Sequence, residues 1–496
     1  MYLGIDLGSS SIKLSLFDAE SGTVIHSLSY PKEELAINAP EFGWAEQNPE
    51  DWWENFQKGY AILIKESGTN PKDIQAIGIS YQMHGLVLVD EKLKVLRPSI
   101  IWCDSRAVEA GNEAFDSLGR AFCLPHLLNS PGNFTASKLA WVKQNEPEIY
   151  SKIHKFMLPG DFIAMKLSGR ITTTNTGLSE GIFWDFKQRG LSQELLSVYG
   201  ISEDLVPEVV PAIGDQVSVK PEVAAQLGLL AGVSITYRGG DQPNNAFSLN
   251  VLNPGETAST AGTSGVIYAV TDKNAYDEKS RINTFLHVND TPEAPRNGVL
   301  ICINGTGILY NWLRRILNTG SGNIDYIHMN DMVDSVKAGS EGLACLPFGN
   351  GAERIFENRI VGSHLLNMDF NRHHTSHILR ASVEGIVYAL NLGFEMLENL
   401  GIEQNRIRAG HANLFLSKSF REIFVNVTGI PLELYNTDGA AGAARGAALG
   451  SGFYTTPEEA FSTLERIAVI DPNPELAENY KQLFGSWKQE IEKHSF

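Results

Sequence analysis

The segment that decides the fold lies at the start of the chain, where residues 2–17 read YLGIDLGSSSIKLSLF. Two short β-favouring runs, Tyr2–Asp6 and Ile12–Phe17, flank a small polar turn. In the second run apolar residues alternate with polar ones, which predicts a strand with one buried face. Ser21-Gly22 then predicts a turn into a third run, Thr23–Leu28, so we expect the chain to open as an antiparallel β-meander.

The same pattern returns half a chain later. Residues 256–270 read ETASTAGTSGVIYAV, which is again a strand, a small polar turn and a strand. This internal echo predicts two duplicated domains, 1–249 and 250–496, with the cleft between them as the natural ligand site. Helical periodicity at 49–66 and 376–400 alternates with strand-like runs, which is typical of an α/β protein.

Glycine is slightly enriched, at 46 of 496 residues, which indicates several places of close backbone approach. The densest such stretch is 438–452, where glycine and alanine predominate. A helix of such small residues can approach its neighbour closely. We therefore predict a helix here that packs tightly against a flat surface.

Charge and composition exclude several classes of partner. Lys and Arg number 40 against 58 Asp and Glu, and the net charge of −18 argues against nucleic acid or an anionic membrane as the main partner. No apolar run approaches the roughly 18 residues that a membrane span needs, and the N-terminus lacks a signal-peptide pattern. The four cysteines form no CxxC pair, so we expect a reduced, cytoplasmic protein without disulfides or structural zinc.

The two small polar turns carry the groups that bind phosphate. Glycine lets backbone N–H donors approach closely, and serine and threonine add hydroxyls. One such turn alone is most often an ordinary hairpin, but two on duplicated domains predict a triphosphate held from both sides of a cleft. The candidate ligands are Gly8, Ser9, Ser10 and Lys13 in the first turn, with Asp6 for Mg²⁺, and Gly262, Thr263 and Ser264 in the second.

A third element follows the apolar run Val233–Tyr237 and reads Arg-Gly-Gly-Asp-Gln, residues 238–242. Asp241 is therefore expected at the end of a strand, beside a glycine turn. A carboxylate there can take the proton from a hydroxyl that attacks a γ-phosphorus atom. Taken alone, Asp241 would more often be a turn residue that caps the next segment.

Two other patterns favour structural roles. Gly177–Gly181 matches the GxSxG of hydrolases, but it leads into Ile-Phe-Trp-Asp-Phe rather than a helix, which disfavours a nucleophilic Ser179. His373, His374 and His377 could bring two imidazoles together for zinc. With no third ligand in the sequence, a solvated helix end is the better interpretation.

These stretches together resemble the FGGY family of carbohydrate kinases over nearly the whole chain. The N-terminal family signature is similar to residues 133–145, apart from Asn133 in its first position. The C-terminal signature is recognisable in residues 363–384, although Asn367 stands where the pattern has Gly. Within the family the chain is most similar to the xylulokinases, whose pattern recurs at residues 44–53, 82–85, 97–106 and 158–161.

The resemblance implies an α/β protein of two duplicated actin-like, or ribonuclease H-like, ATPase domains. It implies ATP and Mg²⁺, a small sugar as the second substrate, and a homodimer by family habit. D-xylulose, converted to D-xylulose 5-phosphate, is the expected sugar. By the same resemblance Asp241 is the catalytic base, Asp6 supports Mg²⁺, the turn from Gly262 holds the ATP phosphates, the adenosine lies near Gly410, and the sugar contacts are Met83, His84, Asp241 and Gln242.

Three departures from the subgroup's pattern keep other substrates open. The Asp241-Gln242 pair is more like that of glycerol kinases, Tyr81 replaces a Gly at the expected pocket edge, and His411 stands in the turn that would face the purine. The alternatives are a kinase for D-ribulose, sedoheptulose or glycerol, and a non-catalytic sugar sensor. An actin-like chaperone ATPase is a third, but it would have no use for the sugar-side motifs.

Overall fold

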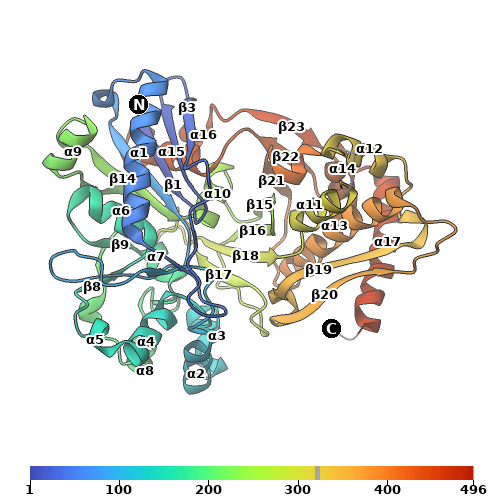
Figure 1. The fold of residues 1–496 in the computed structure, drawn as a ribbon, viewed down its shortest axis with the longest axis horizontal. Helices are drawn as coiled ribbons and strands as arrows, with labels where there is room; N and C mark the ends of the chain where they lie inside the picture. The colour runs from blue at the N-terminus through green and yellow to red at the C-terminus, as the bar shows by residue number, and fades with distance from the viewer. Residues whose placement is uncertain (319–323, 495–496) are drawn as a thin grey trace.

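The computed structural model describes residues 1–318 and 324–494, in which each half of the chain is built around its own β-sheet (Figure 1). The first sheet has the strand order β13-β14-β5-β1-β2-β3. Strands β1, β2 and β3 form the predicted antiparallel meander. The bounds are β1 Tyr2–Leu7, β2 Ile12–Asp18, β3 Thr23–Tyr30, β5 Ala76–Tyr81, β13 Ile213–Ser218 and β14 Ser234–Gly240.

Three strands of the first sheet run parallel and end side by side. In the pairing of β1 with β5, Leu7 lies opposite Tyr81, and in the pairing of β14 with β5, Gly240 lies opposite Tyr81. Ligands of open α/β sheets bind at the carboxyl ends of such strands. The register therefore carries Asp6, the segment after Tyr81, and Asp241 to one edge of the sheet.

The second sheet repeats the first. Its order is β17-β18-β16-β15-β21-β22-β23. Across this sheet from β18 to β23, successive strand pairs are antiparallel, antiparallel, parallel, parallel and antiparallel. The strand pairs of the first sheet follow the same order of directions from β3 to β13. The echo in the sequence is thus part of a duplication of the whole sheet. The bounds are β15 Glu256–Ala261, β16 Gly265–Thr271, β17 Asn283–Leu286, β18 Asn297–Ile303, β21 Arg406–Gly410, β22 Leu432–Tyr435 and β23 Arg466–Ile470.

Helices cover the sheets where the hydrophobic patterns predict them. Helices α1, Pro49–Ser67, and α6, Pro159–Ser168, pack together on the first sheet, with the rings of Trp52 and Phe162 6.2 Å apart. Helix α13, Thr375–Asn399, runs through the core of the second half and closely matches its predicted bounds. The other helices are α2 Val108–Leu118, α3 Arg120–Leu127, α4 Thr135–Asn145, α5 Pro147–Tyr150, α7 Asn175–Glu180, α8 Gln193–Tyr199, α9 Pro221–Leu227, α10 Asp241–Ser248, α11 Gly307–Leu317, α12 Tyr326–Asp334, α14 Lys418–Thr428, α15 Gly439–Gly450, α16 Pro457–Phe461 and α17 Pro474–Lys493.

Small sheets complete the fold. The longest is the hairpin of β19, Ala344–Glu353, and β20, Arg359–Leu366, in the second half. The remaining strands are β4 Glu46–Gln47, β6 Val87–Val89, β7 Ser99–Ile100, β8 Lys155–Met157, β9 Thr172–Thr174, β10 Trp184–Asp185, β11 Gly190–Leu191 and β12 Glu208–Val210.

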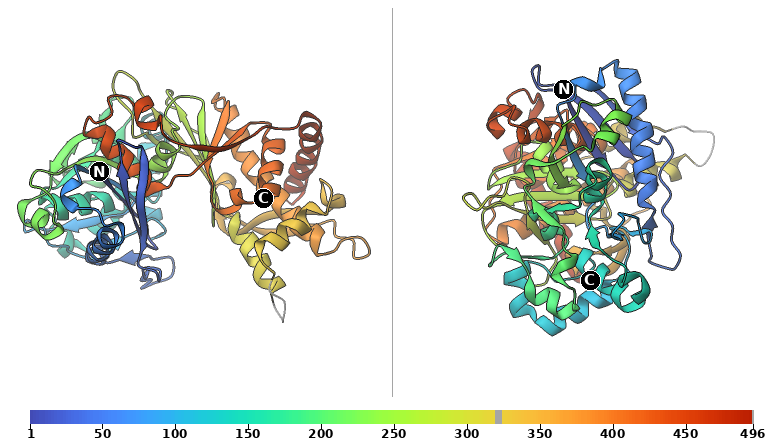
Figure 2. Two further views of the ribbon diagram at one scale, coloured as in Figure 1. Left: turned by 90° about the horizontal axis from the view of Figure 1, so that it is seen from above. Right: turned by 90° about the vertical axis from the view of Figure 1, so that its left-hand side faces the viewer.

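Helix α15 joins the two halves. It belongs to the second half by sequence, yet it packs on the first sheet, and Figure 2 shows this red segment against the blue strands near the N-terminus. A Cβ atom on Gly4 or Gly78 would overlap the backbone carbonyl of Ala440 or Ala443. The sequence predicted such a helix but not which surface it covers.

Alternation along β1 explains which side chains meet α15. Successive residues of a strand point to opposite faces of the sheet. The odd-numbered residues Leu3, Ile5 and Leu7 pack in the cluster of α1 and α6. The even-numbered residues face α15, so Asp6 lies against Gly439 at the N-terminus of that helix.

The motifs given structural roles occupy structural positions. Ser179 is buried in α7, where its Oγ accepts a hydrogen bond from the Leu286 amide at 2.9 Å, and residues 182–186 after the motif are not helical, as predicted. His374 precedes α13, and the described residues contain no group of three or more His, Cys, Asp or Glu placed to hold a metal ion. All four cysteines are free thiols. No helix in the described ranges combines the length and apolarity needed to cross a membrane.

We expect Gly78→Ala to destabilise the protein, because the new methyl group must displace the backbone of α15. Overpacking of this kind costs about 2 kcal/mol or more of unfolding free energy. The matched control is Gly485→Ala in α17, where nothing lies within 4 Å of the added Cβ. A helical Gly-to-Ala change of that kind should be neutral or stabilise by about 0.5–1 kcal/mol. Urea unfolding of the two variants measures both effects, and equal stabilities would contradict the close packing.

His287 gives an expected pH dependence of stability. Its side chain is fully buried, its Nδ1 lies 3.0 Å from the Tyr268 hydroxyl, and burial lowers its pKa to about 3. Between pH 6.5, which is about the ordinary pKa of histidine, and pH 3, the unfolded chain therefore binds a proton at His287 that the folded protein does not bind. The free energy of unfolding falls as the pH falls through that window.

From pH 7 to pH 5 this residue should contribute a loss of about 2 kcal/mol in unfolding free energy. The free energy of unfolding of His287→Gln should fall by correspondingly less over the same pH change. The exposed His154→Gln is the control and should behave as the wild type does. Urea titrations at the two pH values measure the difference, and an unchanged pH dependence in His287→Gln would refute a neutral buried imidazole.

Candidate active site

The carboxyl-end edge of the first sheet gathers most of the predicted catalytic and sugar-binding residues. Asp6 lies near the end of β1, the segment Gln82–His84 follows β5, and Asp241 begins α10 directly after β14. The Gln82 amide donates to the Leu7 carbonyl at 2.7 Å and ties the first two strand ends together.

Asp241 is suited to act as a base. Burial and the nearby charge of Asp6 raise its pKa to about 7, while hydrogen bonds from Gln242 and the charge of Lys13 oppose this shift. A general base works best when its pKa lies near the working pH. Gln242, predicted as a sugar contact, is thus also a hydrogen-bond partner of Asp241.

Asp6 has the surroundings of a cation ligand. Its Oδ1 accepts a hydrogen bond from Ser80 at 2.8 Å, and its Oδ2 lies 3.9 Å from Lys13 Nζ. Burial raises its pKa, and the charge of Asp438 adds to this effect. Three carboxylates, those of Asp6, Asp241 and Asp438, therefore lie near one ammonium group. Mg²⁺ is usually held by one or two carboxylates together with substrate phosphates and water. Asp6 with one neighbouring carboxylate fits that requirement, which does not need a group of three protein ligands.

His84 has a backbone φ of 61°, and its ring packs between aromatic side chains of the two halves. The centroid distances are 4.8 Å to Phe134 and 5.3 Å to Phe285. Its Nδ1 lies 2.9 Å from the Glu180 carbonyl, and Lys138 Nζ donates to the His84 carbonyl at 2.8 Å. Burial and the charge of Lys138 lower the pKa of His84 to about 3. The imidazole is therefore neutral, with Nδ1–H as donor and Nε2 as acceptor.

Met83 and Glu180 lie beside the last residue of β14. Met83 is buried, and a Cβ atom on Gly240 would overlap both its side chain and the Glu180 carboxyl group. Burial and the charge of Asp241 raise the pKa of Glu180 well above its usual range, so it is a neutral acid. Nothing in the motifs singles out Glu180, because only the fold brings it to Asp241.

A cavity of about 270 Å³ contains phosphate-binding candidates from both halves. Lys13, Gly262 and Gly410 line it, together with Asp438 and Gly439 at the start of α15. Helix N-termini favour anions because their free N–H groups and dipole are positive. The cavity therefore combines a lysine, a glycine turn and a helix N-terminus.

Gly8, Ser9 and Ser10 do not line that cavity. The Gly8 amide donates to the Ser11 carbonyl at 3.0 Å and closes the turn on itself. Ser9 turns away, since its carbonyl accepts from Gln47 at 2.7 Å and its hydroxyl from Trp102 at 3.4 Å. Of the first turn's candidates, Lys13 alone reaches the cavity lining.

A larger cavity of about 700 Å³ adjoins this one and shares Ala261, Gly262 and Asn413 with it. Thr263 lines it, as do residues of α11 and α12, including Tyr310 and Tyr326, whose rings stack with centroids 5.7 Å apart. The motifs do not predict these lining residues, because α11 and α12 carry no phosphate-binding motif. Ser264 lines neither cavity and instead contacts Cys302.

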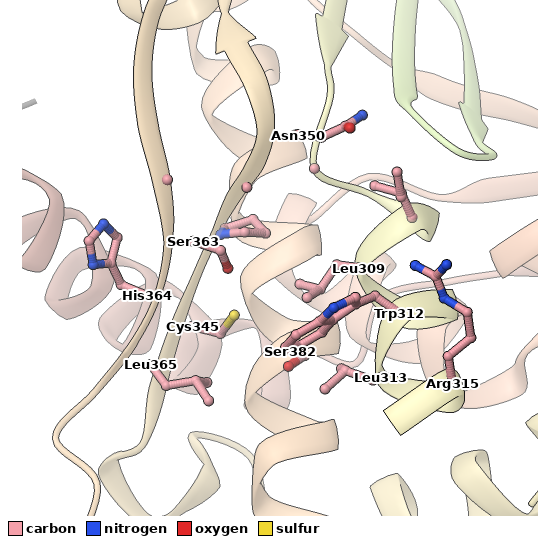
Figure 3. Close-up of a pocket in the computed structure, with 15 residues that line it drawn as sticks. Leu309, Trp312, Leu313, Arg315, Cys345, Asn350, Ser363, His364, Leu365 and Ser382 are labelled. Atoms are coloured by element: carbon pink, nitrogen blue, oxygen red, sulfur yellow. The ribbon is translucent and has the colours of Figure 1, made fainter. Parts of the chain in front are cut away.

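Two departures from the family pattern have little effect on these cavities. Tyr81, expected to make the pocket edge bulkier, is fully buried, with its ring against Gly160. His411, expected to crowd the purine, is exposed and lines neither cavity. A third cavity, of about 590 Å³ between α11 and the β19–β20 hairpin, contains none of the predicted site residues (Figure 3).

Solved structures share this fold. A xylulose kinase from Rhodospirillum rubrum superposes with a TM-score of 0.89 at 24% identity, covering 99% of this chain and 98% of that one. A glycerol kinase from Plasmodium falciparum, solved with ADP, gives a TM-score of 0.87 at 20% identity, covering 100% and 98%. The predicted fold of two duplicated actin-like domains is thereby confirmed.

Sequence comparison gives the family. The model of the FGGY family of carbohydrate kinases, N-terminal domain, matches residues 1–248. The xylulose kinase of Bacillus subtilis strain 168 is 31% identical in an alignment of 498 positions, which covers 98% of this chain and 95% of that protein. On the strength of both matches, the chain belongs to the FGGY family of carbohydrate kinases.

Proposed function

We propose that this carbohydrate kinase uses ATP to phosphorylate D-xylulose to D-xylulose 5-phosphate. The observation that carries the proposal is the position of Asp241 directly after β14. There its carboxylate interacts electrostatically with Glu180, whose carbonyl contacts His84, and with Lys13, which lines the smaller cavity. Relatives that bear the name xylulose kinase support this choice of sugar.

The proposed reaction is a direct transfer of the γ-phosphoryl group. Asp241 takes the proton of the sugar hydroxyl, whose oxygen forms the new bond to phosphorus while the bond from phosphorus to the β,γ-bridging oxygen breaks and ADP leaves. Lys13 and the N-terminus of α15 hold the phosphate charge. Asp6, with Asp438 nearby, would hold Mg²⁺, which supplies further charge neutralisation when bound.

In this proposal each of the two adjoining cavities binds one part of the nucleotide. The phosphates lie in the smaller one, at the second turn, and the nucleoside lies in the larger one against α11 and α12. Domains 1–249 and 250–496 would close over both substrates, excluding water as a competing acceptor. The homodimer that the resemblance implies stays a prediction, which sedimentation can measure.

Asp241→Asn should lower kcat by about a thousandfold or more, because the amide keeps the shape of the side chain but cannot accept the proton. ATP affinity should stay within about threefold of the wild-type value, since Asp241 is outside the cavity lining. The exposed Asp215→Asn on the same sheet is the control. ADP release measures turnover, and near-normal turnover by Asp241→Asn would show that another group is the base.

A substrate panel tests the choice of sugar. With Mg-ATP we expect D-xylulose to give a higher kcat/KM than D-ribulose, sedoheptulose or glycerol. Gln242 makes glycerol the sharpest competitor, because the Asp-Gln pair resembles that of glycerol kinases. Turnover only on another member of the panel would keep the mechanism and change the substrate. Tight sugar binding without any turnover would instead support a sensor.

A further inference from the structure

The stretch that is similar to the N-terminal family signature, residues 133–145, contains none of the predicted site residues. It comprises helix α4 and the two residues before it, and it packs against the turn that follows β5. The ring of Phe134 lies 4.8 Å from the ring of His84. From within the helix, Lys138 reaches the same turn with its side chain.

The side chain of Lys138 is fully buried and ends on two backbone carbonyl groups. Its Nζ donates to the carbonyl of His84 at 2.8 Å and to the carbonyl of Ile101 at 3.0 Å. The first carbonyl lies in the turn after β5, and the second comes directly after β7. Lys138 therefore connects these two segments through their backbones.

Packing alone does not account for a lysine at this position. Burial lowers the pKa of Lys138 to about 7, although the charge of Asp104 opposes this shift. In the described parts of the chain no carboxylate oxygen lies within 4.0 Å of Lys138 Nζ, and Asp104 is itself bound to Arg106 at 2.7 Å. Enclosing an amino group without an ion pair is costly, and an apolar side chain would fill the space without that cost. The hydrogen bonds to the two carbonyls are what the amino group adds.

The conformation of His84 indicates what these bonds do. Its φ of 61° is uncommon for a residue other than glycine and persists only where surrounding contacts hold it. The ring is held by Phe134 and Phe285 and by the contact of Nδ1 with the Glu180 carbonyl at 2.9 Å. Lys138 holds the backbone of the same residue. Ring and backbone are thus fixed by separate contacts.

We propose that Lys138 is a positioning residue, which fixes the backbone of His84 so that the ring keeps its bond to Glu180 and offers Nε2 to a hydroxyl group of the sugar. This inference rests on the proposed function, since it needs a sugar beside His84. Lys138 itself would touch neither substrate, because its Nζ is enclosed and bound to the two carbonyls. Without those donors, two carbonyl oxygens lose their partner and the turn can relax to a commoner backbone conformation.

The first test is Lys138→Met, which keeps a long side chain but removes its donors, assayed with the sugar that the wild type phosphorylates best. The KM for the sugar should rise at least about tenfold, while the KM for ATP stays within about threefold of the wild-type value. The matched control is Lys143→Met in the same helix. Lys143 Nζ also donates to two carbonyls, those of Tyr199 and Gly200, but neither belongs to the candidate site. Both KM values of this control should stay unchanged.

The protonation of the His84 ring measures the positioning directly and needs no substrate. In nitrogen-15-labelled wild type at neutral pH, long-range proton–nitrogen correlation spectra should show a single neutral tautomer of His84 with its proton on Nδ1. The signals are assigned by their loss in His84→Asn. Lys138→Met should populate both tautomers, because the ring is no longer held at the Glu180 carbonyl, whereas Lys143→Met should keep the wild-type spectrum.

An unchanged KM for the sugar in Lys138→Met, an equal rise in KM for sugar and ATP, or a ring that keeps its single tautomer would overturn the proposal. If Lys138→Met fails to fold, Lys138→Gln decides by the same ratio and spectrum, since its shorter side chain keeps N–H donors without the charge. Wild-type turnover across the substrate panel tests the proposed function separately. The ring spectrum decides on Lys138 even if no sugar in the panel reacts, so the two failures are distinguishable.

Discussion

The close packing of helix α15 on strands β1 and β5 joins the two halves of the chain and fixes the geometry of the cavity that we propose for the phosphates. Gly4 and Gly78 lack side chains where the backbone of α15 passes, so helix and sheet approach more closely than any other residue would allow. The same contact places Asp438 and Gly439 against Asp6 and opposite Lys13. Without it, the first phosphate turn would face no counterpart from the second half.

Charge is divided across the candidate site in a way that suits the two proposed substrates. On the phosphate side, Asp6, Asp241 and Asp438 outnumber Lys13, an imbalance that a divalent cation and a helix N-terminus offset. On the side that we propose for the sugar, His84 and Glu180 are both neutral because burial disfavours their charged forms. Neutral donors and acceptors match the hydroxyl groups of a sugar, while the charged side matches a triphosphate.

Local pattern predicted the elements well where a single face or turn decides them. The meander at the N-terminus, helix α13 and the strand-end position of Asp241 all follow from short-range signals, and the structure has each of them. Ser9 and Ser10 show what such signals leave undecided. A serine-rich turn is compatible with phosphate binding, yet contacts with Gln47 and Trp102, distant in sequence, direct Ser9 elsewhere.

The sequence by itself determined the α/β class, the duplication, the family and the placement of Asp6 and Asp241 at strand ends, because periodicity, turn chemistry and contiguous motifs are local properties. The tertiary structure decided which surface α15 covers, which turn residues reach the cavity lined by Lys13 and Gly262, and that Glu180 lies beside Gly240 and near the charge of Asp241. Those outcomes depend on strand register and on contacts between residues that lie from 38 to more than 400 positions apart. No spacing within a single segment encodes such contacts.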